Sequence, residues 1–122
     1  MPTDPDIVES RVIDTARLDD LRALLGDALD DILRTWLIDA PAILAGARLA
    51  RLAGEPDALL KAIHGVKGSA GNVGAIELSD VAYTLEQHLK RADPALDLDA
   101  ELSRLETCYN RAACHIRTLI RS

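Results

Sequence analysis

Apolar residues recur at steps of three and four along most of the chain, which is the spacing of one face of a helix. Asp14 is a suitable N-cap and Gly26 a suitable stop for a first, short helix. Pro41 lies inside the second apolar segment, where it removes a backbone donor, so we expect a kink or a restart there. The four longer predicted helices cover about residues 27–52, 56–73, 76–92 and 98–120.

The same spacing predicts which side chains face the core. In the first helix these are Leu18, Leu21 and Leu25. In the second helix the inward stripe is expected to consist of Leu29, Ile32, Leu33, Trp36, Ala40, Ile43, Leu44 and Ala47. In the third it is Leu59, Ile63, Val66 and Ala70, after which Gly74 is a suitable left-handed stop.

These helices predict an all-α fold, because the chain shows no strand pattern and the loops are short. Four amphipathic helices bury their stripes most simply as an antiparallel up-down-up-down four-helix bundle, with the short N-terminal helix capping one end. We expect residues 1–13, which contain Pro2 and Pro5, to be a tail or linker. Residues 14–122 are then the single domain.

Composition supports helices and excludes several classes of function. The chain has 20 leucines and 19 alanines but only 5 valines. A net charge of −6 and 2% aromatic residues argue against nucleic-acid binding. No segment approaches the roughly 18–20 apolar residues of a membrane span, and the acidic start does not resemble a signal peptide.

The two cysteines point to neither a disulfide nor a metal site. Cys108 and Cys114 lie on one predicted helix at a separation that suits a disulfide poorly, which favours a reducing, cytoplasmic location. His115 lies beside them, but the three share one helix with no tetrahedral partner. We expect His88 and His115 to be structural or solvated.

The third predicted helix carries the candidate chemistry. His64 lies roughly 120° from the middle of the inward stripe, so we expect it at the exposed edge. Lys61 and Lys67 flank it, and they are two of the three lysines in the chain. Such a positive spot on an acidic protein attracts a phosphoryl group or an acidic partner.

Several glycines, which have no side chain, lie in the same segment. They stand at 65, 68, 71 and 74, although each glycine inside a helix costs about 1 kcal/mol relative to alanine. One reason to tolerate that cost at Gly68 and Gly71, on the His64 side, is close approach by another macromolecule. An unperturbed imidazole is mostly neutral at pH 7 and can attack phosphorus. The chain has no Walker loop, kinase glycine loop or obvious Mg²⁺ site, so a partner must supply the metal.

The pattern His64-x-x-Lys67-Gly68-Ser69-Ala70-x-x-Val73-Gly74-Ala75 resembles the signature of histidine-containing phosphotransfer (HPt) domains of two-component phosphorelays. The similarity spans about residues 14–120. It implies that a receiver-domain aspartate phosphorylates His64 and that another receiver then takes the phosphoryl group. Gly65, in place of a small polar residue, and Trp36, where Phe is usual, depart from the family pattern.

The resemblance also implies roles for neighbouring residues. Lys67 is expected near the phosphoryl group, and Glu86 at the position that often supports the imidazole. For Glu86 the alternative is a plain surface carboxylate, and for Lys61 a solvated charge. The partner-docking surface is expected to include Leu60, Lys61, Gly68 and Gly71.

The expected partners are response-regulator receiver domains and a sensor histidine kinase, of hybrid type or not. The chain is expected to be a cytoplasmic, monomeric phosphocarrier, not an enzyme, without a cofactor of its own, and Mg²⁺ is expected on the receiver. Two other functions stay open. The chain could be the His-bearing substrate domain of a chemotaxis-type kinase, or a helical bundle that only binds partners.

Overall fold

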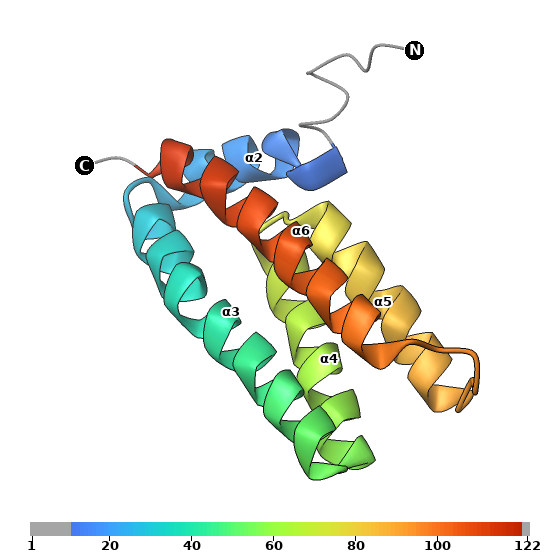
Figure 1. The fold of residues 1–122 in the computed structure, drawn as a ribbon. Helices are drawn as coiled ribbons and strands as arrows, with labels where there is room; N and C mark the ends of the chain where they lie inside the picture. Colours follow the sequence, from blue (N-terminus) through green and yellow to red (C-terminus); the bar gives the residue numbers. More distant parts are fainter. Residues whose placement is uncertain (1–10, 121–122) are drawn as a thin grey trace.

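The computed structural model describes residues 11–120, which contain five complete helices and no strand (Figure 1). The all-α prediction is therefore confirmed. The observed bounds differ from the predicted ones by at most two residues, because the apolar periodicity of each segment is strong. The helices are α2 (Thr15–Leu25), α3 (Ala28–Ala53), α4 (Pro56–Asn72), α5 (Ile76–Lys90) and α6 (Leu98–Leu119).

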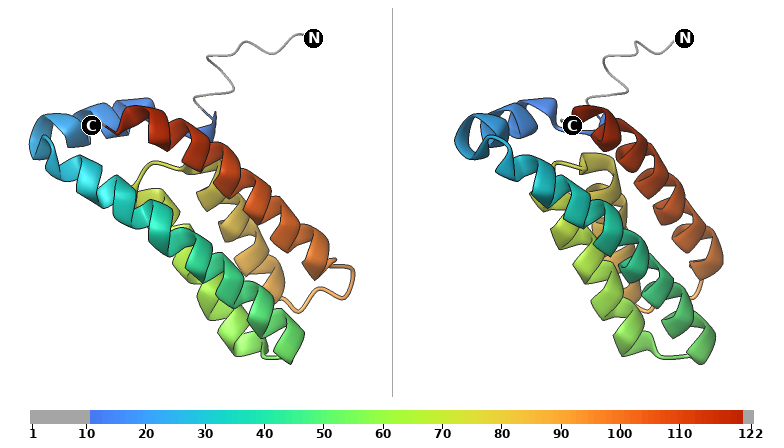
Figure 2. Two further views of the ribbon diagram at one scale, coloured as in Figure 1. Left: turned by 60° about the vertical axis from the view of Figure 1, so that its left-hand side comes forward. Right: turned by 90° about the vertical axis from the view of Figure 1, so that its left-hand side faces the viewer.

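The four longer helices lie alongside one another, and the chain reverses direction at each turn between them (Figure 1). Helix α4 packs against α3 and α5, and α6 packs against the same two helices. Helix α2 lies across the end of this group where α3 begins and α6 ends (Figure 2). Among the described helices only α3 and α5 pack closely against α4, which leaves another side of α4 open.

Short-range signals fix the ends of α2 and α4 as predicted. The Asp14 carboxylate accepts a hydrogen bond from the Arg17 backbone N–H at 3.0 Å, so Asp14 is the N-cap of α2. Gly74, after α4, has a φ of +73°, and a Cβ there would lie 3.3 Å from the Asp14 carbonyl oxygen. The Asp14 N–H also donates to the Gly74 carbonyl at 2.8 Å. The turn that ends α4 therefore holds the start of α2.

Three details of the predicted core are wrong. Val12 and Ile13, assigned to the tail, are buried, so the packed part begins before residue 14. Residues 1–10 of that tail lie outside the described residues. Leu25 is 40% exposed, because α2 crosses the end of the bundle and buries only Leu18. Ile32 is 45% exposed, because it lies at the edge of the arc that α3 turns inward.

Helix α3 continues through Pro41, so the restart considered for this position does not occur. Pro41 has no N–H to donate to the carbonyl of Leu37, four residues earlier. The Tyr109 hydroxyl of α6 donates to that carbonyl at 3.1 Å and replaces the missing donor. The Tyr109 ring also lies against Trp36, with 5.3 Å between ring centroids. A contact with a distant helix thus compensates for the proline.

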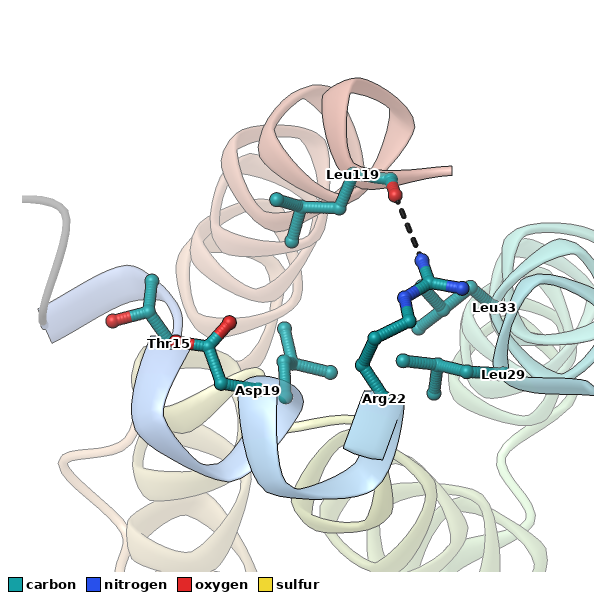
Figure 3. A pocket seen from close by; sticks show the side chains of 7 residues that line it. Thr15, Asp19, Arg22, Leu29, Leu33 and Leu119 are labelled. Atoms are coloured by element: carbon teal, nitrogen blue, oxygen red, sulfur yellow. Dashed lines mark hydrogen bonds between the residues drawn. The ribbon is translucent and has the colours of Figure 1, made fainter. Parts of the chain in front are cut away.

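Arginines tie the helices together. Arg22 of α2 donates to the buried Asp30 carboxylate at 2.8 Å and to the Leu119 carbonyl, at the end of α6, at 3.0 Å. Figure 3 shows this guanidinium beside a cavity of about 180 Å³ between α2, α3 and α6. Arg48 of α3 pairs with Glu106 of α6 at 2.8 Å. These pairs hold the bundle at sites away from α4.

Candidate functional site

His64 stands on the uncovered side of α4, as its register predicts. Its side chain is 66% exposed. The inward residues of the same helix are 3% exposed or less, namely Leu59, Ile63, Val66 and Ala70. Burial of that stripe fixes the rotation of α4 and so presents the imidazole to solvent.

Glu86 reaches His64 from α5. Its Oε2 lies 2.6 Å from Nδ1 of His64, and its Oε1 accepts a hydrogen bond from Nζ of Lys67 at 2.9 Å. The Glu86 side chain is only 2% exposed. The surface-carboxylate interpretation of Glu86 is therefore wrong, and the contact with His64 is present.

The charge on Glu86 decides which imidazole nitrogen is free. The Lys67 hydrogen bond, followed by the one to His64, holds the pKa of Glu86 below its ordinary value of 4.5, against the effect of burial. An ionised carboxylate can only accept hydrogen bonds. Nδ1 of His64 must then carry a proton, and in the neutral form of the ring the lone pair lies on Nε2.

Lys67 is held on the side of His64 that faces α5. Its Nζ lies 5.5 Å from the centroid of the Tyr83 ring, in addition to its bond to Glu86. Its backbone carbonyl accepts a hydrogen bond from the Ser79 hydroxyl at 3.1 Å. These contacts from α5 leave the Lys67 side chain 27% exposed, close to the imidazole but accessible.

The glycines open the surface to different degrees. Apart from its chain neighbours and the backbone of its own helical turn, no atom lies within 4 Å of a Cβ added at Gly68, so the space beside it is free. A Cβ at Gly71 would lie 3.6 Å from Ser79 Oγ, and one at Gly65 3.8 Å from the Ile43 side chain, which are ordinary contacts. None of the three is required by packing, which agrees with a role for Gly68 outside the fold.

A shallow cavity of about 310 Å³ adjoins His64, and two of the predicted docking residues, Leu60 and Lys61, line it. Its lining consists of Asp57, Leu60, Lys61, His64, Glu86 and Lys90. Sequence reasoning missed Lys90, whose Nζ lies 3.9 Å from Oε1 of Glu86. The available signal was the spacing of four residues between Glu86 and Lys90 on one helix. All three lysines of the chain therefore surround this histidine and its carboxylate.

Other candidate groups are not assembled into sites. Cys108 and Cys114 are free thiols, the first buried, and burial raises the pKa of Cys108. Between residues 11 and 120, no three His, Cys, Asp or Glu side chains are grouped closely enough to hold a metal ion. His88 and His115 are half-buried and do not line the cavity beside His64.

Comparison with known families agrees with this geometry. The family model of the Hpt domain matches residues 31–114, which is more than half of the chain and contains the whole of α4 and α5. The chain belongs to the Hpt domain family. This Hpt domain therefore has a histidine phosphotransfer role in two-component signalling, where Hpt domains interact with receiver domains and kinases.

Two further comparisons gave negative results. No curated protein and no solved structure matches this Hpt domain significantly. In the part of the chain that the structure describes, every helix is too short or too polar to cross a bilayer.

Proposed function

We propose that this Hpt domain is a relay intermediate that accepts a phosphoryl group on His64 from a receiver aspartate and passes it to another receiver aspartate. The observation that carries this proposal is the pairing of Nδ1 with the buried Glu86 carboxylate on an exposed ring, because the neutral ring then has its lone pair on Nε2. The domain that carries this function consists of residues 14–122 together with the buried Val12 and Ile13. It is an antiparallel four-helix bundle capped by α2.

The transfer step balances on these atoms. The Nε2 lone pair attacks phosphorus, the P–N bond forms, and the P–O bond to the aspartate breaks, so that the carboxylate leaves with the electron pair. Nδ1 keeps its proton, and the ring acquires a positive charge. The Glu86 carboxylate, 2.6 Å away, compensates that charge as it develops. Attack on phosphorus by the next aspartate returns the electron pair to Nε2.

Neighbouring side chains have supporting roles in this proposal. Lys67 neutralises charge on the phosphoryl oxygens. Leu60, Lys61, Gly68 and Gly71 belong to the surface on which the receiver docks, and the lysines favour an acidic partner. The divalent metal is expected on the receiver, so the chain itself acts as a phosphocarrier rather than an enzyme. We also expect the protein to be cytoplasmic and monomeric.

The decisive experiment mixes the chain with a phosphorylated receiver domain in the absence of ATP and of any kinase. We expect acid-labile phosphate to appear on wild-type protein and not on His64→Gln. Labelling that requires the ATP-binding domain of a kinase would instead favour the substrate domain of a chemotaxis-type kinase. No labelling from either donor would favour a bundle that only binds partners.

A further inference from the structure

One oxygen of Glu86 has two cations in reach. Oε1 is 2.9 Å from Nζ of Lys67 and 3.9 Å from Nζ of Lys90. The Lys90 side chain is 53% exposed and that of Lys67 27% exposed. In the unphosphorylated protein Lys67 is therefore the hydrogen-bonded partner, and Lys90 stands just beyond hydrogen-bond distance.

Phosphorylation of His64 would create a competition for Lys67. The phosphoryl group on Nε2 brings negative charge and strong acceptor oxygens to the site. If Lys67 turns toward them, Oε1 of the buried Glu86 loses the ammonium group that donates a hydrogen bond to it. A buried carboxylate without a partner is costly, so this loss would oppose the movement of Lys67.

We propose that Lys90 is a positioning residue that takes over Oε1 of Glu86 when Lys67 turns to the phosphoryl group. This inference rests on the proposed phosphorylation of His64. It requires Nζ of Lys90 to approach Oε1 by about 1 Å, from 3.9 Å to hydrogen-bond distance. A change of side-chain rotamer is sufficient, because Glu86 precedes Lys90 by one helical turn on α5.

We call this replacement of Lys67 by Lys90 at Oε1 of Glu86 the handover. It can be tested before any phosphoryl group is present. Carbon-13 NMR would follow the titration of the Glu86 carboxyl in wild type, Lys67→Met, Lys90→Met and the double variant. Either lysine alone should keep the carboxylate paired, so each single change should raise the pKa of Glu86 only slightly. The double change should raise it by about one unit or more beyond the sum of the two. Additive shifts would overturn the proposal.

Lys61→Met is the matched control for this titration. Lys61 lines the same cavity and carries the same charge, but it forms no ion pair with Glu86. It should leave the titration of Glu86 unchanged in both the wild-type and the Lys67→Met backgrounds. If Lys61→Met shifted the pKa of Glu86 as much as Lys90→Met does, the total positive charge near Glu86, and not the handover, would control that pKa.

A second measurement tests the phosphorylated state and does not depend on the double variant folding. Phosphoramidate, a small phosphoryl donor, would load the wild-type protein, Lys90→Met and Lys90→Arg. We expect Lys90→Met to reduce the steady-state fraction of phosphorylated His64 several-fold and Lys90→Arg to restore it. Equal loading of all three would overturn the proposal. A wild-type protein that takes no phosphoryl group from phosphoramidate or any receiver would contradict the proposed function, and the NMR titration would still decide whether Lys90 can replace Lys67.

Discussion

Nδ1 of His64 and Oε2 of Glu86 lie 2.6 Å apart, and this contact decides the chemistry of the imidazole. Nδ1 is occupied by the carboxylate, and no hydrogen bond to Nε2 is formed by the described residues, on a ring that is 66% exposed. We therefore expect one species of phosphohistidine, bonded through Nε2 of His64. Nitrogen-15 NMR of the phosphorylated protein should show phosphorus coupling at that nitrogen alone.

The other two histidines provide the control for this prediction. His88→Gln and His115→Gln should be labelled like wild type. Loss of labelling in either variant, or coupling at Nδ1 of His64, would contradict the assignment.

Replacing Glu86 by Gln should slow transfer several-fold, because the charge that stabilises the positively charged ring is lost. The amide can still accept from Nδ1, but it cannot compensate the charge on the ring. Helix content, followed by circular dichroism, should be unchanged. A rate equal to that of wild type would show that the carboxylate charge has no part in the reaction.

Glu86 should also make stability depend on pH. Because its pKa is lower in the folded protein than the ordinary 4.5, it contributes stability above pH 4.5 that is lost as the pH falls through the folded value. The free energy of unfolding of Glu86→Gln should therefore fall less steeply with acid below pH 4.5. Urea unfolding at several pH values tests this, and parallel curves for the two proteins would contradict it.

Gly68 should separate docking from folding. No atom outside its own helical turn lies within 4 Å of the position that an added methyl group would take, so Gly68→Ala should stabilise the fold by about 0.4–1 kcal/mol. Gly68→Arg should also fold, since its side chain extends into solvent, but it should block the approach of a receiver. The melting temperature and the rate of transfer would be measured on each variant. Normal transfer by Gly68→Arg would place the docking surface elsewhere.

The bond from Tyr109 to Leu37 should depend on Pro41. Tyr109→Phe leaves a backbone carbonyl without its donor and should cost about 1–2 kcal/mol in the free energy of unfolding. In a Pro41→Ala background the alanine N–H can donate to that carbonyl, so the same change should cost much less. A double-mutant cycle by urea unfolding measures the difference, and equal costs in both backgrounds would contradict this account.

Lys61 should act mainly on association. Lys61→Ala removes charge beside His64 but no bond to Glu86, so it should lower the association rate with a receiver several-fold at low salt. The difference from wild type should shrink as salt increases. Lys67→Ala, by contrast, should slow the transfer step itself at saturating receiver. An association rate for Lys61→Ala that is unchanged at low salt would support the solvated-charge alternative.

Periodicity was sufficient to predict the helices, because each segment must bury one face. It also placed His64 at an exposed edge, since four buried neighbours fix the rotation of α4. It could not show that Glu86 is buried, because that depends on how α5 is rotated against α4. The donor from Tyr109 was equally hidden, because 72 residues separate it from Leu37. Val12 and Ile13 were missed because two apolar residues are too few to define a period.

The arginines and the lysines lie in different places, and this difference has a practical consequence. Several arginines form ion pairs between helices, as Arg48 does with Glu106, whereas the lysines gather around Glu86 and His64. A reagent that acylates lysine amines would therefore neutralise the side chains of this one face and leave the guanidinium pairs of the bundle intact. Among the side chains, ordinary amine labelling is therefore directed to this face, and protection of these three lysines would report a bound partner on the histidine face.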